Sequence, residues 1–131
     1  MSGKVVIAAA LAAAFGLVRP PQAAAHAELD EQLAAVSAEI GLNPGSAELY
    51  LNRAQLYEER GAWYEALMDL AEAERLAPDD PRIGVERGRI QMEAGRPISA
   101  RRALDQAVET HPDWAEAWMQ RGRLFLHLGE Q

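Results

Sequence analysis

The side chains that could support catalysis or metal binding are few in this 131-residue sequence and lie far apart. The three histidines are His26, His111 and His127, and no two of them stand three or four residues apart. That spacing is what brings two metal ligands to one face of a helix. The absence of cysteine excludes disulfides, thiolate zinc sites and a thiol nucleophile. We therefore expect no metal site.

Other catalytic patterns are missing as well. The serines lack the glycine pattern that surrounds a nucleophilic serine in many hydrolases, and there is no glycine-rich phosphate loop. The adjacent carboxylates Glu58 and Glu59 are more typical of a solvated helix face than of an acid–base pair. The sequence predicts a protein that is not an enzyme and holds no cofactor.

The overall charge narrows the choice of partners. The chain has 13 Lys and Arg against 20 Asp and Glu, a net charge of −7 at pH 7. An acidic surface repels phosphate backbones, so nucleic acid is not an expected partner. Hydrophobic residues make up 49% of the chain, which is typical of a folded globular protein.

The amino terminus, residues 1–27, has the features of a secretory signal peptide. Lys4 precedes an uncharged, apolar run at residues 5–18, and Arg19-Pro20-Pro21 should end any helix there. Cleavage after Ala27 or after Ala25 would leave a periplasmic or secreted protein with no membrane segment. The run is shorter than the about 20 residues of a spanning helix. An uncleaved membrane anchor stays open as the alternative.

The rest of the chain repeats with a period of 34 residues, since eight identities link residues 47–80 to residues 81–114. The period continues at Arg121 and Gly122, which follow Arg87 and Gly88 by 34 positions. The eight pairs are Arg53/Arg87, Glu59/Glu93, Gly61/Gly95, Ala66/Ala100, Leu70/Leu104, Ala73/Ala107, Pro78/Pro112 and Asp79/Asp113.

These positions resemble the tetratricopeptide-repeat family, whose repeats combine aromatic, small and large apolar residues with a closing proline. The matches in the first repeat are Tyr50, Ala54, Tyr57, Ala66, Leu70, Ala73 and Pro78. The second repeat matches at Gly88, Ala100, Leu104, Ala107 and Pro112, and the third at Trp118, Gly122 and Phe125. Gly84 and Gln91 replace the aromatic residues in the second repeat.

The resemblance implies an all-α fold, an α-solenoid of antiparallel helix-turn-helix pairs. About 2.5 repeats, at 47–80, 81–114 and 115–131 (partial), would fill a domain at 46–131. The expected helices are 46–60, 63–77, 81–94, 97–110 and 114–128. Small residues at Ala54, Gly88 and Gly122 should let paired helices approach closely.

Local signals mark the ends of these helices. Gly61 and Gly95 should end the first helix of each pair, where a left-handed residue is needed. Asp80 before Pro81 predicts a helix cap, and Ser46 should cap the first helix. Asp113 and Glu116 have the spacing of a capping box.

A further helix is expected at 28–42, with Leu29, Leu33, Val36 and Ile40 along one apolar stripe. Residues 28–45 are then either a simple capping helix or the second helix of a degenerate repeat. The sequence favours neither interpretation.

In the tetratricopeptide-repeat family, the first helices of the pairs line a concave groove that binds a protein or peptide. The resemblance implies such a groove in this chain. The groove positions that we predict to contact a partner are Asn52, Gln55, Glu59, Arg82, Arg89, Glu93, Met119, Gln120 and Arg123. Members of the family that bind chaperone peptides hold a terminal carboxylate with cationic residues. No cation stands at the corresponding positions, which are Leu51, Gln55, Glu86, Glu116 and Gln120. We expect instead a peptide with apolar anchors and a basic end near Glu58 and Glu59.

Two further features have competing interpretations. Arg53, Arg87 and Arg121 form either a cationic stripe or, as we favour, ion pairs with carboxylates of neighbouring helices. The last helix, 114–128, is apolar on more than one side and has no second helix after it. This pattern fits a fragment of a longer array, docking onto a partner, or self-association.

We predict that the protein is an adaptor, scaffold or assembly factor. The alternative is a structural subunit of a larger envelope assembly, docked through this helix.

Overall fold

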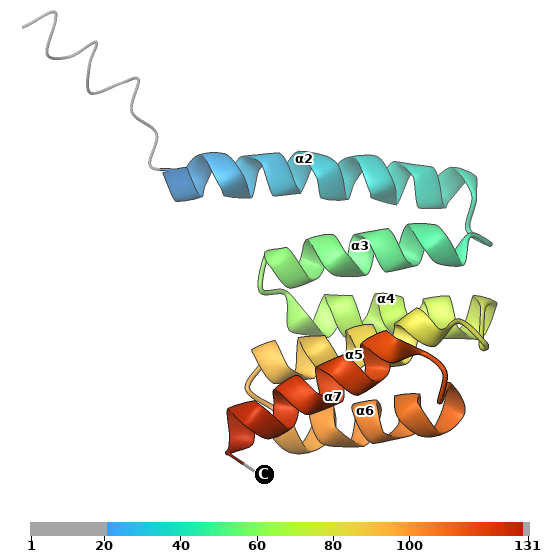
Figure 1. Ribbon diagram of the computed structural model, residues 1–131. Helices are drawn as coiled ribbons and strands as arrows, with labels where there is room; N and C mark the ends of the chain where they lie inside the picture. The colour runs from blue at the N-terminus through green and yellow to red at the C-terminus, as the bar shows by residue number, and fades with distance from the viewer. Residues whose placement is uncertain (1–20, 130–131) are drawn as a thin grey trace, which may run out of the picture.

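The computed structural model describes residues 21–129, and the fold of these residues is all-α (Figure 1). The predicted solenoid of antiparallel helix pairs is confirmed. Each of the five helices expected after residue 45 begins and ends within one residue of its expected bounds. The helices are α2 (Pro21–Leu42), α3 (Ala47–Glu59), α4 (Trp63–Leu76), α5 (Pro81–Glu93), α6 (Pro97–Thr110) and α7 (Ala115–Leu128).

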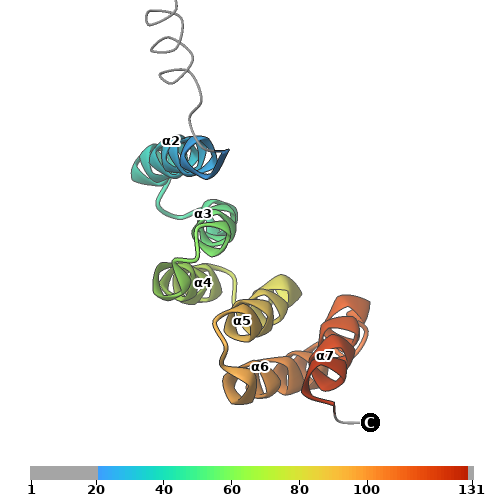
Figure 2. The ribbon, with the colours of Figure 1, turned by 90° about the vertical axis from the view of Figure 1, so that its left-hand side faces the viewer.

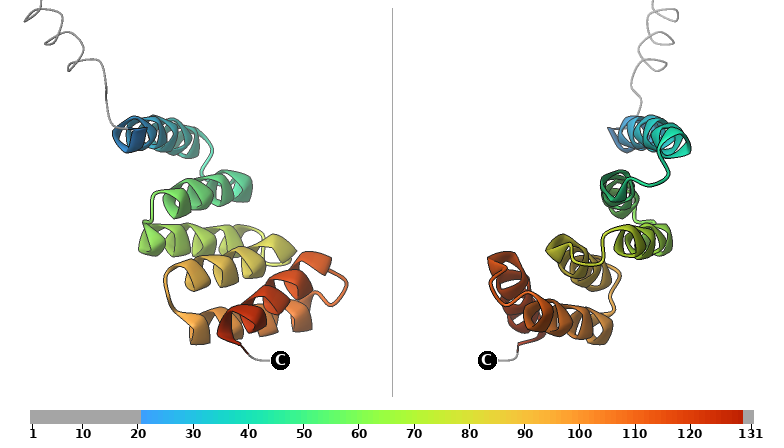
Figure 3. Two further views of the ribbon diagram at one scale, coloured as in Figure 1. Left: turned by 60° about the vertical axis from the view of Figure 1, so that its left-hand side comes forward. Right: turned by 90° about the vertical axis from the view of Figure 1, so that its right-hand side faces the viewer.

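The helices follow an arc, which is clearest when the molecule is viewed along the helix axes (Figures 2 and 3). The first helices of the pairs, α3, α5 and α7, lie on the inner side of the arc, and α4 and α6 lie on the outer side. We call the solvent-facing side of α3, α5 and α7 the inner surface.

Small residues bring the paired helices together, as the repeat predicts. Ala66 and Ala100 are completely buried, and so are the large side chains Leu70 and Leu104. A Cβ atom placed on Gly88 would lie 2.4 Å from Cγ of Leu104, so no larger residue fits there without movement. The core is therefore a series of small clusters between neighbouring helices, as in other repeat proteins.

The turns bear out some of the predicted helix signals. Gly61 and Gly95 have φ of 76° and 71°, the left-handed conformation that favours glycine. Asp80 caps α5, since its carboxylate accepts a hydrogen bond from the backbone N–H of Arg82 (3.0 Å), and Pro81 occupies the first helical position.

Two predicted caps do not form. Trp114, not Asp113, stands at the cap position of α7, and no side chain caps that helix. The carboxylate of Glu116 accepts a hydrogen bond from Gln120 (2.7 Å) rather than from the start of the helix, so the predicted capping box is wrong. Ser46 does occupy the cap position of α3, but its side chain makes no capping hydrogen bond.

The start of α2 is also corrected, because this helix begins at Pro21 rather than at residue 28. The prolines were expected to end a helix of the preceding residues, which lie outside the described ones, and Pro21 is the first described residue of α2. Proline is tolerated at a first helical position because its missing N–H is not needed there, and the alanines after it favour helix. The predicted cleavage sites, after Ala25 and Ala27, therefore lie inside α2. Residues 1–20, which hold the rest of the predicted signal peptide, lie outside the described residues. Among the helices from Pro21 onward, none is both long and apolar enough to cross a membrane.

The packing of α2 resembles that of a second helix of a pair. Arg53 of α3 donates a hydrogen bond to Ser37 of α2 (3.1 Å), and Arg121 of α7 contacts Asp105 of α6 (2.6 Å). In both cases the partner lies 16 residues upstream, on the helix that precedes the arginine. This geometry favours the degenerate-repeat interpretation of residues 28–45, which stays a prediction.

Candidate functional site

The recurring arginines are held within the fold. Arg53 binds Asp69 through two hydrogen bonds of 2.7 Å, which raise the pKa of Arg53. Ring faces of Tyr50 and Tyr57 also flank its guanidinium. The corresponding pairs elsewhere are Arg87–Glu74 (2.7 Å) and Arg121–Asp105 (2.6 Å). The structure therefore supports ion pairing between helices rather than a free cationic stripe.

Most of the residues predicted to contact a partner are exposed on α3, α5 and α7. Arg89 is half-buried, and Gln120 is buried beside Glu116. Gln120 thus offers little surface to a partner. Its contact with a partner stays a prediction. The exposed members of the set are Asn52, Gln55, Glu59, Arg82, Glu93, Met119 and Arg123.

Arg82 is already engaged at the start of α5. Its guanidinium lies 2.7 Å from Glu48 of α3 and 2.8 Å from its neighbour Asp80. Hydrogen bonds to these two carboxylates raise the pKa of Arg82, the larger contribution coming from Asp80. The side chain links α3 to α5 at this end of the inner surface.

At the other end of α3, five side chains surround a hollow of about 300 Å³ between α3 and α5. Arg89 forms an ion pair with Glu58 (2.7 Å) and another with Glu86. We call this site the Glu58 pocket. The residues that line it are Gln55, Glu58, Glu59, Arg89 and Glu93.

Glu58 is the unusual member of this pocket, because only 5% of its surface is exposed. Burial raises the pKa of its carboxyl to about 7, and repulsion from Glu93, Glu86 and Glu59 adds to the rise. Arg89 acts in the opposite direction but does not cancel the effect. The solvated-face interpretation of Glu58 is therefore wrong, while Glu59 is indeed exposed.

One feature of the sequence could have predicted that Glu58 is buried. The residue 34 positions later is Met92, which packs partly buried against the cluster of Ala100, Leu104 and Leu124. A glutamate at a position that is apolar in the next repeat predicts a buried carboxylate. Its pairing with Arg89 depends on how the two repeats stack, which the period alone does not give.

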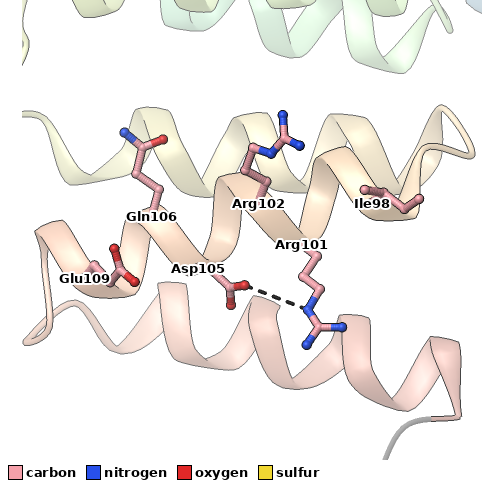
Figure 4. Close-up of a pocket in the computed structure, with 6 residues that line it drawn as sticks. All are labelled: Ile98, Arg101, Arg102, Asp105, Gln106 and Glu109. Atoms are coloured by element: carbon pink, nitrogen blue, oxygen red, sulfur yellow. Dashed lines mark ion pairs between the residues drawn. The ribbon is translucent and has the colours of Figure 1, made fainter.

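A larger hollow, of about 430 Å³, lies on the outer side of α6 (Figure 4). Its lining residues come from this one helix, and in the picture they point in different directions. Arg101 and Asp105 point toward α7, where Asp105 pairs with Arg121 and Arg101 lies over the ring of Phe125. The hollow is thus an open face, and two of the four charged residues that line it, Arg101 and Asp105, are already engaged.

The chemistry available to the inner surface is recognition by charge and apolar contact. Beyond the Glu58 pocket, α7 exposes Met119 (47%) and Leu126 (81%). Such side chains give adaptable apolar contacts to a partner. Within residues 21–129, no three histidine, aspartate or glutamate side chains converge to hold a metal ion.

Comparison with known proteins agrees with this architecture. The tetratricopeptide-repeat family model matches residues 85–131, and no curated protein matches the chain. The structure is similar to the tetratricopeptide-repeat domain of Arabidopsis OM64, at 22% identity and a TM-score of 0.67, over 81% of this chain and 88% of that one.

Two further structures show the same fold. A thermophilic tetratricopeptide-repeat protein of Thermus thermophilus gives a TM-score of 0.75 at 22% identity, over 82% of this chain and 55% of that one. The second such domain of human RPAP3, solved in complex with an HSP70 peptide, gives 0.65 at 18% identity, over 76% and 82%. At these identities the similarity establishes the fold alone.

Proposed function

We propose that this chain, which has the fold of a tetratricopeptide-repeat solenoid, is a protein-interaction module. It would bind a segment of another protein along its inner surface. It would act as an adaptor, scaffold or assembly factor and would not catalyse a reaction. The observation that carries the proposal is the inner surface itself. Three successive first helices expose polar and apolar side chains to solvent, and Met119 and Leu126 are the exposed apolar ones that a partner would contact.

The structural relatives support this class of function. The RPAP3 domain named above holds an HSP70 peptide on the same fold. In the present chain the hollow between α3 and α5 is lined by three glutamates and one arginine, a charge that would repel an acidic peptide end. We therefore do not extend the ligand of RPAP3 to this chain.

Export to the periplasm or outside the cell is part of the proposal. It is supported by the sequence pattern of residues 1–27, with its charged start, apolar run and small residues at Ala25 and Ala27. Mass determination of the protein recovered from the envelope fraction tests it. An amino terminus at Glu28 or His26 is expected, and an intact Met1 in a membrane pellet would indicate the anchor instead.

Affinity capture from the native envelope fraction tests the inner surface. The variant Met119→Asp should reduce capture of the partner at least about tenfold, because it places a charge against an apolar contact. The matched control is Met68→Asp on α4 of the outer side, where Met68 is 55% exposed against 47% for Met119.

The comparison of these two variants decides the outcome. Met68→Asp should leave capture unchanged, and both variants should melt as the parent chain does. If the parent chain and both variants capture the partner equally, or if both variants lose capture equally, the inner surface is not the binding site.

A second candidate function has its own observation. The side of α7 that carries Trp118 and Gly122 is uncovered among residues 21–129, since nothing lies within 4 Å of a Cβ placed on Gly122 and Trp118 is 48% exposed. A structural subunit, or a self-associating one, would dock through this face. Sedimentation of the parent chain and of Trp118→Glu tests it, and a monomer at all concentrations argues against self-association.

A further inference from the structure

The Glu58 pocket contains a carboxylate oxygen that has no partner. Oε2 of Glu58 lies 2.7 Å from Nη2 of Arg89, but Oε1 is buried and accepts no hydrogen bond from the described residues. A buried polar atom without a partner is costly and rare in folded proteins. Glu58 also lines the hollow on the inner surface, so a ligand there could supply the missing donor if the carboxylate turned Oε1 toward it.

The charges around this oxygen are unbalanced. Glu59 comes from the same helix, and Arg89 and Glu93 line the pocket from α5. Glu86, also on α5, pairs with Arg89 and repels the Glu58 carboxylate. From α2, Glu28 borders a smaller hollow of about 200 Å³ that also reaches Glu59. One guanidinium thus stands among four carboxylates on α3 and α5, and Arg89 is already shared between Glu58 and Glu86.

We infer that the Glu58 pocket receives a lysine or arginine side chain of the bound protein segment. The inference rests on the proposed function and names the chemistry that this part of the inner surface recognises. The Glu58 carboxylate would turn to accept a hydrogen bond from the cationic N–H through Oε1, and the cation would offset the negative charge of Glu59 and Glu93. A hollow of about 300 Å³ has room for such a side chain.

Burial is the main cause of the raised pKa of Glu58, and Arg89 offsets it only in part, so the pocket has too little positive charge to restore the ordinary pKa. A cation that enters the pocket would favour the ionised form and release a proton. A divalent metal ion is a poorer occupant, since no metal-binding group of three side chains is found in residues 21–129.

Carboxyl ¹³C NMR at pH 7 on the glutamate-labelled chain tests the inference. The probes are N-acetyl-lysine-N-methylamide and N-acetyl-arginine-N-methylamide, with the uncharged norleucine analogue as control. Either cationic probe should move the Glu58 carboxyl signal toward its ionised position in a saturable way, and norleucine should not. No shift with either cation, or the same shift with norleucine, would overturn the inference.

Variants locate the effect. Glu58→Gln should weaken binding of the lysine probe about tenfold, the usual loss for a charge-assisted hydrogen bond. Glu93→Gln, which leaves the buried ion pair intact, should weaken it about threefold. Binding to Glu93→Gln is read from the Glu58 signal, and binding to Glu58→Gln from the remaining pocket signals. The matched control is Glu65→Gln on α4. Glu65 is exposed, as Glu93 is, and this variant should bind the lysine probe as the parent chain does.

Two outcomes would contradict the inference. Equal binding of the lysine probe by Glu93→Gln and Glu65→Gln would place the cation elsewhere, and a larger shift with Mg²⁺ than with lysine would point to a metal.

This result and the capture result are separable. If Met119→Asp lowers capture but the lysine probe leaves Glu58 unchanged, the inner surface binds a partner without the cation contact. If the probe binds but capture is insensitive to Met119→Asp, the pocket is real and the proposed function fails.

Discussion

Gly88 and Gly122 occupy the same position in successive repeats but meet different surroundings. A Cβ on Gly88 would lie 2.4 Å from Leu104, whereas a Cβ on Gly122 would meet nothing within 4 Å among the described residues. The repeat period alone would assign the two glycines one role, yet only Gly88 is required by close packing.

We predict opposite effects of alanine at these two glycines. Gly88→Ala should lower the free energy of unfolding by about 1–3 kcal/mol, because the methyl group overpacks the contact with Leu104. Gly122→Ala should raise it by up to about 1 kcal/mol, since alanine favours a helix more than glycine does. Urea unfolding of both variants checks this. Equal destabilisation would mean that Gly122 is also covered.

Glu58 makes stability depend on pH. Its folded-state pKa of about 7 lies above the ordinary value of 4.5, so folding favours the protonated form. This contribution is fully present below about pH 4.5 and is lost as the pH rises through 7, a fall on the order of 2–3 kcal/mol. Urea midpoints at pH 5 and pH 8 measure it.

The comparison for this prediction is Glu58→Gln, which should flatten the pH dependence between these two values. Glu59→Gln, at the exposed neighbour, should keep most of it. A parent chain with the same midpoint at both pH values would show that the carboxyl is ionised throughout.

At the scale of the helix, Asp80 and Ser46 stand at equivalent cap positions with different contacts. Asp80 accepts the N–H of Arg82, which together with the Arg82 guanidinium lowers the pKa of Asp80, the guanidinium contributing more. Ser46 makes no capping hydrogen bond.

Asp80→Ala should therefore cost about 1 kcal/mol of unfolding free energy, while Ser46→Ala should be close to neutral. Because the pKa of Asp80 lies below its ordinary value of 3.8, this loss should shrink only below about pH 4 and should be smaller, but not absent, at pH 3. Thermal unfolding at pH 7 and pH 3 checks both points, and a larger effect at Ser46 would contradict the cap assignment.

The helix boundaries were predictable because period, proline and glycine act locally. Gly61, Gly95 and Pro97 fix the turns by backbone geometry that any neighbour must accept. The capping box at Asp113 was not predictable in this way, because several side chains compete for one helix end. The helical conformation of residues 21–27 was missed because these residues were assigned to the signal peptide, although the alanines among them favour helix.

The candidate site was predictable in its location but not in its pairing. The family resemblance placed Gln55, Glu59, Arg89 and Glu93 in one groove, and they do line one hollow. The burial of Glu58 and the ion pairs of Arg82 and Arg89 depend on the distance between α3 and α5. That distance follows from the packing of all four helices of two repeats, which no local pattern encodes.

At the scale of the whole molecule, α2 is uneven in its attachment. Its carboxyl-terminal half packs on α3 through Ile40 and Ser37. Its first turns extend past the end of α3, and residues 21–28 are exposed (Figure 1). The contacts there are an ion pair between Asp30 and Arg60 and a hydrogen bond from Arg60 to the carbonyl of His26 (3.5 Å).

A chain that starts at Glu28 should unfold within about 1 kcal/mol of one that starts at Pro21, because few contacts are lost. A chain that starts at Asn43 lacks α2 and should lose about 2 kcal/mol or more with the burial of Ile40. Urea unfolding of the three chains checks this. A large loss in the chain from Glu28 would show that the first turns of α2 support the fold.

The first turns of α2, which few contacts hold, also bear on how the chain could be cut. Peptidases accept their substrates as extended backbone, so a helix must open locally before a bond inside it is cleaved. Helical turns that few neighbours hold open at small free-energy cost, whereas turns inside a packed solenoid open only with their repeat. Bonds next to Ala25 and Ala27 would thus stay accessible to an enzyme even after the repeats had folded, and processing and folding could occur in either order.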